Sequence, residues 1–260
     1  MSPYPLFVDV VKSLRLDLYR TDWERALRIA EHLTLHARDL GPIQSDLQTT
    51  YRKITTGHGY CADFVKVFIG LALTATICCR QWAFSFDGFG GHGHTIVEIF
   101  DTASHKWRFI DVYNNIHACD ARTGIPMTAL EFRDALLSGY PAFNIHRNGA
   151  GRIGFPVEEK LIAYYKRGLQ EWYLICGNAV FTREANVLVR RLSRLPGPLG
   201  RFISGLGERT AIQILATPDN LQRVDALLMV KRNLLIAAVA LGMLLFMLIV
   251  LVCRTFVVWT

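Results

Sequence analysis

The stretch Gly-His-Gly-Tyr-Cys-Ala-Asp-Phe at residues 57–64 decides the fold, because this glycine-rich turn leads into a long apolar run at 65–79. Apolar spacings of three and four and the absence of proline predict a buried helix that begins near Cys61. Asp63 falls in its first turn, where a carboxylate suits the positive end of the helix dipole. At the start of the predicted helix, the helix dipole and the unpaired backbone N–H groups favour the thiolate form of Cys61. The apolar positions of the predicted helix are Phe64, Val67, Phe68, Leu71, Ala72 and Ala75.

Two short strands follow and supply the other polar groups. Residues 94–100 and 107–113 are rich in β-branched and aromatic residues and are joined by a polar turn, which predicts an antiparallel hairpin. His94 begins the first strand and Asp111 lies late in the second, near the same end. Cys61, His94 and Asp111 are therefore expected to act as thiol nucleophile, general base and orienting carboxylate.

Other interpretations of these residues are simpler. A free cysteine such as Cys61 is usually a small buried apolar residue, and Asp111 has the alternative of a turn residue at a strand end. His92 and His94, with Cys61 or Asp111, make three ligands for zinc. Neither an H-E-x-x-H nor a C-x-x-C spacing supports this. We therefore expect no metal and no cofactor.

The three motifs together resemble the transglutaminase-like superfamily of the papain-type cysteine fold, in a bacterial membrane-anchored form. They are residues 59–64, 94–99 and 107–111, in the order Cys, His, Asp, and the resemblance covers about residues 45 to 125. It implies an α+β fold in which the cysteine-bearing helix packs on a small antiparallel sheet. The family pattern places the catalytic histidine directly before the alternating apolar strand, so it favours His94 over His92, which would line the cleft.

Charge and hydropathy divide the chain of 260 residues unevenly. Residues 152–232 hold thirteen Lys/Arg and seven Asp/Glu, which predicts an anionic partner for this region. Residues 234–252 are nineteen uncharged, mostly aliphatic residues. As a helix they span roughly 29 Å, close to the hydrocarbon core of a bilayer. We therefore predict a transglutaminase-like core at 1–148, a basic helical membrane-proximal region at 149–232 and a transmembrane helix at 233–253.

The flanks of the apolar segment predict its orientation. Arg223, Lys231 and Arg232 precede it and Arg254 follows it, which favours a large N-terminal part on the cytoplasmic side. Residues 1–11 lack the basic start of a signal peptide. The expected location is the inner (cytoplasmic) membrane, as a single-pass protein anchored at its C-terminus. The six cysteines lack a disulfide-framework spacing, which fits a reducing compartment.

The remaining segments are predicted from periodicity and caps. Thr21 or Asp22 caps a helix and Thr128 caps another. We expect a segment near the membrane surface, at 190–201, to be either interfacial or an ordinary solvated helix face. Helices are predicted at 5–18, 23–38, 45–53, 127–137 and 157–176, possible helix at 178–192, short apolar pieces at 199–206 and 210–215, a strand at 80–86, and irregular chain at 114–126.

The function predicted from these features is thiol-dependent acyl transfer on an amide, ending in hydrolysis or in transfer to an amine. The expected partners are a peptide or amide substrate and anionic membrane lipids, with envelope-assembly proteins as further candidates and no nucleic acid. The oxyanion is assigned to the Cys61 backbone N–H, and the candidates for a side-chain donor are Gln48, His58, Tyr60 and His92. The alternative is a catalytically silent scaffold of the same fold in envelope or polysaccharide assembly.

Overall fold

The computed structural model describes residues 4–43, 45–86, 93–138, 142–151, 154–176, 213–218 and 220–258. The chain separates into two units, Met1–Leu215 and Ala216–Thr260, and the first is an α+β unit built on a small antiparallel sheet. Its elements are α1 (Pro5–Ser13), a 3-10 turn (Leu16–Leu18), α2 (Asp22–Thr34), α3 (Leu47–Ile54), α4 (Cys61–Thr74), β1 (Cys79–Ser85), β2 (Gly93–Asp101), β3 (Lys106–Ile110), β4 (Ile116–Asp120), α5 (Ala129–Ser138), β5 (Phe143–Arg147), α6 (Glu158–Lys166), β6 (Trp172–Cys176) and β7 (Gln213–Ile214).

Five described strands form one antiparallel sheet in the order β3-β2-β1-β6-β7, and β4 pairs with β5 in a two-stranded sheet. Strands β2 and β3 are the predicted hairpin, in which Val97 pairs with Ile110. Strand β1 lies between β2 and β6, and its residue Phe84 is opposite His94 on one side and Trp172 on the other. This register places the start of β2 and the start of β6 at the same end of the sheet, on either side of β1.

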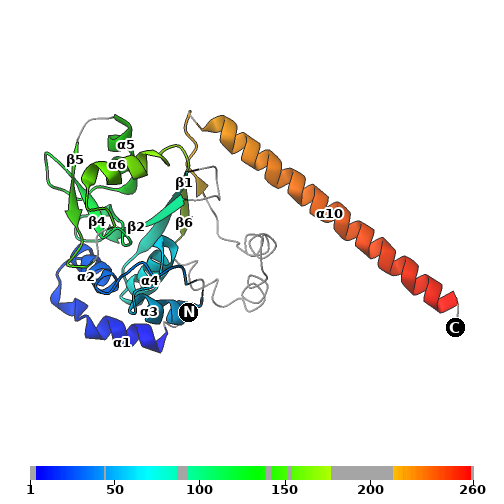
Figure 1. Ribbon diagram of the computed structural model, residues 1–260, viewed down its shortest axis with the longest axis horizontal. Helices are drawn as coiled ribbons and strands as arrows, with labels where there is room; N and C mark the ends of the chain where they lie inside the picture. Colours follow the sequence, from blue (N-terminus) through cyan, green and yellow to red (C-terminus); the bar gives the residue numbers. More distant parts are fainter. Residues whose placement is uncertain are drawn as a thin grey trace. The chain divides into compact units, whose positions relative to one another are not determined.

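The two faces of the sheet belong to two hydrophobic cores, because successive strand residues point to opposite faces. Val97, Ile99 and Ile110 pack with helices α1–α4 in the first core. Ile96 and Phe109 pack with α5, α6 and β6 in the second. Figure 1 shows this division, with α1–α4 on one side of the sheet and the green helices α5 and α6 on the other. Of the predicted catalytic residues, Cys61 begins α4, His94 lies at the start of β2 and Asp111 follows β3.

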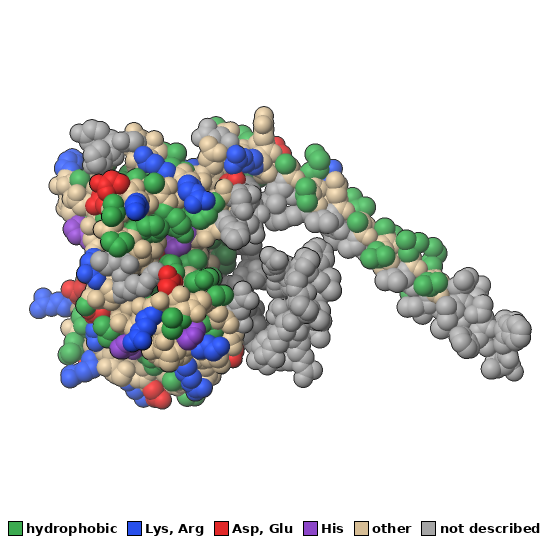
Figure 2. Space-filling model, in the orientation of Figure 1, with side chains coloured by type: hydrophobic (Ala, Val, Ile, Leu, Met, Phe, Trp, Pro, Cys, Tyr) green, Lys and Arg blue, Asp and Glu red, His purple; other side chains and the backbone are tan. Residues whose placement is uncertain are grey.

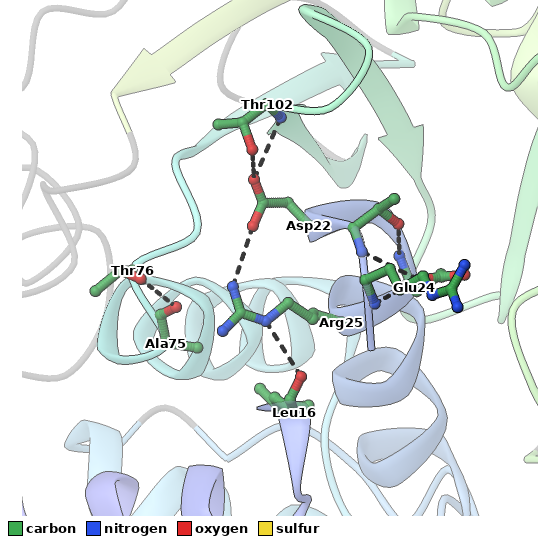
Figure 3. A network of polar contacts seen from close by, with 9 residues as sticks. Leu16, Asp22, Glu24, Arg25, Ala75, Thr76 and Thr102 are labelled. Atoms are coloured by element: carbon green, nitrogen blue, oxygen red, sulfur yellow. Dashed lines mark hydrogen bonds and ion pairs between the residues drawn. The ribbon is translucent and has the colours of Figure 1, made fainter. Parts of the chain in front are cut away.

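The N-terminus of α2 is joined to the turn of the hairpin. Thr21 and Glu24 form a capping box, in which each side chain accepts a hydrogen bond from the backbone N–H of the other, so the predicted cap at Thr21 is confirmed. The Asp22 carboxylate accepts from the backbone and hydroxyl of Thr102, and its other oxygen accepts from Arg25 (Figure 3). These bonds hold the hairpin turn against the helix that packs on α4.

Several predicted elements are confirmed. The helix that begins at Cys61 is α4, and the hairpin is β2 and β3. Helix α5 begins one residue after Thr128, whose hydroxyl accepts from the Glu131 N–H at 3.0 Å. Helix α1 is shorter than predicted, because the chain turns at Arg15, which has a positive φ of 51°.

Two predictions are wrong, both in the second half of the unit. The single helix expected at 157–176 is α6 followed by β6, because the apolar and aromatic run at 172–176 pairs with β1. The segment 114–126, expected to be irregular, contains β4. Since β6 completes the same sheet as β1, residues 154–176 lie in the first unit, although the sequence predicts a boundary after 148. The segments predicted at 178–192, 190–201 and 199–206, and most of 210–215, lie outside the described residues.

The second unit contains α10 (Leu221–Val258), a continuous helix of 38 residues. The Asn220 side chain accepts a hydrogen bond from the Thr217 N–H at 2.8 Å just before the helix begins. Among the described residues, no helix meets the length and hydropathy required of a membrane span. Large apolar side chains are exposed along the described part of α10, as Figure 2 shows, among them Ile236, Val239, Leu241, Leu244, Phe246 and Met247.

Candidate active site

Cys61 is the first residue of α4 and is half-exposed. The turn before it depends on glycine, because Gly57 and Gly59 have φ angles of +100° and +112°. A Cβ atom added at Gly59 would lie 3.1 Å from a ring carbon of Phe64. The glycine-rich turn therefore fixes the direction in which the chain enters α4 and leaves the thiol accessible at the helix N-terminus. The first N–H groups of the helix, that of Cys61 among them, have no intrahelical acceptor.

Asp63 fastens this helix N-terminus to a distant loop. Its carboxylate oxygen Oδ2 accepts from the backbone N–H of Tyr60 at 3.0 Å and from that of Ile43 at 3.2 Å. The side chain is buried. The sequence predicts only the favourable interaction of Asp63 with the helix dipole. The structure adds a clamp that holds both the turn and the loop at the entrance to α4.

His94 and Asp111 form a buried pair across the hairpin. His94 has the same strand parity as Ile96, and Asp111 the same parity as Phe109, so both side chains lie on the α6 side of the sheet. The His94 Nε2 atom is 2.6 Å from Asp111 Oδ2. Both side chains are almost completely buried. The hairpin thus brings together two of the three predicted catalytic residues.

The Asp111 carboxylate receives donors from two further residues. Oδ1 accepts from the backbone N–H of Asn114 at 2.9 Å, and Oδ2 accepts from the Asn114 side-chain amide at 2.7 Å. The Tyr165 hydroxyl also donates to Oδ2. The backbone carbonyl of Asp111 accepts from the side-chain amide of Asn148 at 3.1 Å. Both oxygens of the buried Asp111 carboxylate therefore accept hydrogen bonds, which compensate for the loss of hydration.

Both Asp111 and Cys61 influence the charge of the His94 ring. Burial disfavours the charged imidazole, but the Asp111 carboxylate outweighs this effect and, with a smaller contribution from Cys61, raises the pKa of His94 to about 10. The same pair holds the pKa of Asp111 below its usual range, against the effect of burial. Asp111 occupies Nε2, so Nδ1 is the nitrogen that remains for the thiol. Among the described residues the buried Nδ1 atom has no hydrogen-bond partner, so the direct hydrogen bond of the ring is the one to Asp111.

Aromatic rings enclose His94. Phe84 and Tyr164 meet its ring at centroid distances of 5.6 and 5.4 Å, both nearly edge-to-face. Tyr165 is 6.0 Å away and Tyr113 is 6.3 Å away. Phe84 in turn stacks on Trp172 of β6. The imidazole is therefore held in one orientation by the rings around it and by its bond to Asp111.

The other predicted candidates lie in different surroundings. Gln48 is half-buried on α3, and Tyr60 is exposed. His58 is half-buried in the turn before α4, with its Nδ1 3.4 Å from the Thr56 hydroxyl. His92 lies outside the described residues. Within the described part of the chain, no group of three or more His, Cys, Asp or Glu side chains is arranged to hold a metal ion.

Three residues of this site are not predicted from the sequence. Asn114 has a local signal, since an Asp followed three residues later by the N–H that it accepts is a common turn. Tyr164 and Tyr165 have none, because they belong to α6, fifty or more residues beyond the hairpin.

Comparison with known proteins finds no family model, no curated protein and no solved structure that matches the chain. The site is therefore interpreted from its geometry. It comprises a half-exposed thiol at a helix N-terminus, an imidazole beside it and a buried carboxylate behind the imidazole.

Proposed function

We propose that the protein is a cysteine-dependent acyl-transfer enzyme that acts on an amide bond. The proposal is carried by the pairing of the buried His94 with Asp111, in which Nε2 lies 2.6 Å from Oδ2. Cys61 at the start of α4 contributes to the raised pKa of this histidine. A nucleophile, a base and an orienting group within reach of one another are what covalent catalysis by cysteine requires.

The chemistry follows from these positions. The Cys61 thiolate attacks the carbonyl carbon, and the carbonyl electron pair moves to the oxygen. The intermediate then expels the amine, which takes a proton from the His94 imidazolium. Water or a second amine attacks the thioester, gives its proton to His94 and expels the Cys61 thiolate, which restores the starting thiolate and imidazolium. Asp111 keeps Nε2 protonated throughout, so that Nδ1 is the atom that exchanges protons with substrate.

The fold relationship that we propose is to the transglutaminase-like superfamily of the papain-type fold. It is supported by the order Cys61, His94, Asp111 along the chain and by a cysteine-bearing helix packed against an antiparallel sheet. Hydrolysis and amine transfer use the same residues. Product analysis with and without an added primary amine separates the two.

The test is alkylation of the full chain by iodoacetamide at pH 6, with the label located by tryptic peptide mapping. Cleavage after Lys53, Lys66 and Arg80 places Cys61 and Cys78 on separate peptides. Cys78 is the matched control, because it is more exposed than Cys61 and follows the other end of the same helix. An ordinary thiol is less than about 1 % thiolate at pH 6, so a thiolate paired with His94 is expected to react at least about tenfold faster than Cys78.

The variant His94→Gln is expected to remove this advantage. If Cys61 reacts no faster than Cys78 at pH 6, or if His94→Gln leaves the rate unchanged, the catalytic proposal fails. The scaffold of the same fold then becomes the better explanation, and a Cys61→Ser chain should retain its cellular role.

We further propose that α10 attaches the protein to a membrane with anionic lipids, with the catalytic unit on the cytoplasmic face. Support comes from the uncharged sequence at 234–252 and from the exposed apolar side chains of α10. The full chain is expected to float with phosphatidylglycerol-containing vesicles and to resist extraction by alkaline carbonate. The variant Val239→Lys/Phe246→Lys is the control and should be released. Equal release of the two chains would refute the anchor.

A further inference from the structure

The proposed reaction requires a second donor for the oxyanion. The tetrahedral intermediate places a negative charge on the former carbonyl oxygen, and two preorganised donors commonly stabilise it. The backbone N–H of Cys61 is one such donor, because it is at the N-terminus of α4. A second donor must be a polar hydrogen near Cys61 and His94 that is not already committed to another acceptor.

Three tyrosines surround His94, and two of them are committed. The Tyr165 hydroxyl donates to Asp111, and the Tyr113 hydroxyl donates to Asp39. The Tyr164 hydroxyl forms no hydrogen bond with any other residue that the structure describes. Its phenol is half-buried, so its proton can be offered to a bound substrate.

The ring of Tyr164 is held rigidly beside the reacting groups. It meets the His94 ring edge-to-face at 5.4 Å. Phe86 and Phe155 pack against it at 5.0 Å each, which restricts its rotamer. A donor fixed in this way does not have to reorganise as charge develops.

We infer that the Tyr164 hydroxyl donates the side-chain hydrogen bond to the oxyanion that forms when Cys61 is acylated. The inference rests on the proposed function and names a donor outside the candidates that the sequence offers, Gln48, His58, Tyr60 and His92.

The electrostatics of the phenol agree with this role. Burial and the negative charges of Asp111 and Cys61 raise the pKa of Tyr164 well above its usual range. The hydroxyl therefore stays protonated throughout the working pH range. No proton is transferred in the step. The thiolate sulfur forms a bond to the carbonyl carbon, the π electron pair moves to oxygen, and Tyr164 donates a hydrogen bond to that oxygen.

The experiment compares two reactions of the same sulfur. Alkylation of Cys61 by iodoacetamide forms no oxyanion, whereas acylation by p-nitrophenyl acetate passes through one. In the full-length variant Tyr164→Phe, acylation is expected to fall at least about tenfold, toward the 10²–10³ of a fully engaged donor, while alkylation changes less than about twofold. The ratio of the two rates cancels any general loss of folded protein.

The variant Tyr113→Phe is the matched control. It removes a hydroxyl from another ring near His94, and that hydroxyl is bound to Asp39, so the ratio of rates should not change. If Cys61 is alkylated preferentially in both chains but Tyr164→Phe is acylated at the native rate, this inference fails and the proposed function stands. An equal loss of both reactions would assign Tyr164 to positioning His94 and would also overturn the donor role. A failure of preferential alkylation in the native chain sinks the proposed function itself.

Discussion

Tyr165→Phe tests whether the carboxylate behind His94 is held as the structure indicates. The substitution removes one hydroxyl and keeps a fully buried ring in place. That hydroxyl donates to Asp111 Oδ2, which also accepts from His94 at 2.6 Å and from the Asn114 amide at 2.7 Å. A hydrogen bond to a charged group contributes about 1.5–3 kcal/mol. Because Oδ2 keeps two donors, we expect a loss near the low end, about 1.5 kcal/mol.

The assay is urea unfolding followed by tryptophan fluorescence at pH 7 and at lower pH. For a unit of this size the expected loss corresponds to roughly 3–6 °C in Tm. Tyr165 is among the groups that hold the pKa of Asp111 below 3.8, against the effect of burial. The stabilisation is therefore present above pH 3.8, and the gap between native and variant chains should narrow as pH falls through the lowered pKa.

Tyr164→Phe is the matched control, because it removes the hydroxyl of the adjacent residue, which donates to no described residue. It is expected to change the free energy of unfolding by less than about 0.5 kcal/mol. Two results would refute the reasoning. One is a loss below about 0.5 kcal/mol for Tyr165→Phe at pH 7, and the other is an equal loss for the two variants.

Three further predictions concern groups elsewhere in the site and its supports. The raised pKa of His94 stabilises the folded native chain, fully so below pH 6.5, and His94→Gln removes this stabilisation. The difference in unfolding free energy between the native chain and the variant should therefore narrow as pH rises toward about 10, the pKa of His94 in the folded chain. Burial raises the pKa of Cys79 to about 12, so iodoacetamide at pH 8 should label it only after denaturation, while exposed Cys78 is labelled in the native chain. Gly59→Ala forces a side chain into the left-handed region, at about 1–2 kcal/mol, and against an aromatic ring. It should therefore destabilise the protein more, and slow Cys61 alkylation more, than Gly41→Ala, which has a φ of +110° but open space around it.

The parts of the fold that the sequence predicts are those fixed by residues close together in the chain. The cap at Thr21 involves Glu24, three residues on. The start of α4 follows from a glycine turn and an apolar period within twenty residues. The approach of His94 to Asp111 follows from a hairpin, whose register sets which residues face each other.

The parts that it does not predict depend on distant partners. The run at 172–176 carries apolar residues that suit a helix or a strand equally, and only the available edge of β1 makes it β6. The Tyr165 hydroxyl reaches Asp111 across 54 positions. A helical period identifies which residues of α6 are apolar, and it contains no information about which carboxylate a hydroxyl will meet. For the same reason, the clamp from Asp63 to Ile43 has no local signal.

The burial of His94 and Asp111 favours an enzyme over a scaffold on energetic grounds. Removing two charges from water costs several kcal/mol per ion, and well-packed apolar residues in place of a buried ion pair are often neutral or stabilising. This pair is almost completely buried, and two further side chains, Asn114 and Tyr165, are committed to Asp111. A scaffold needs only the shape of this region, which apolar side chains provide at lower cost. The half-exposed Cys61 thiol at the start of α4 gives that arrangement a use, because a thiolate stabilised by an imidazolium can attack a substrate only if the sulfur is accessible.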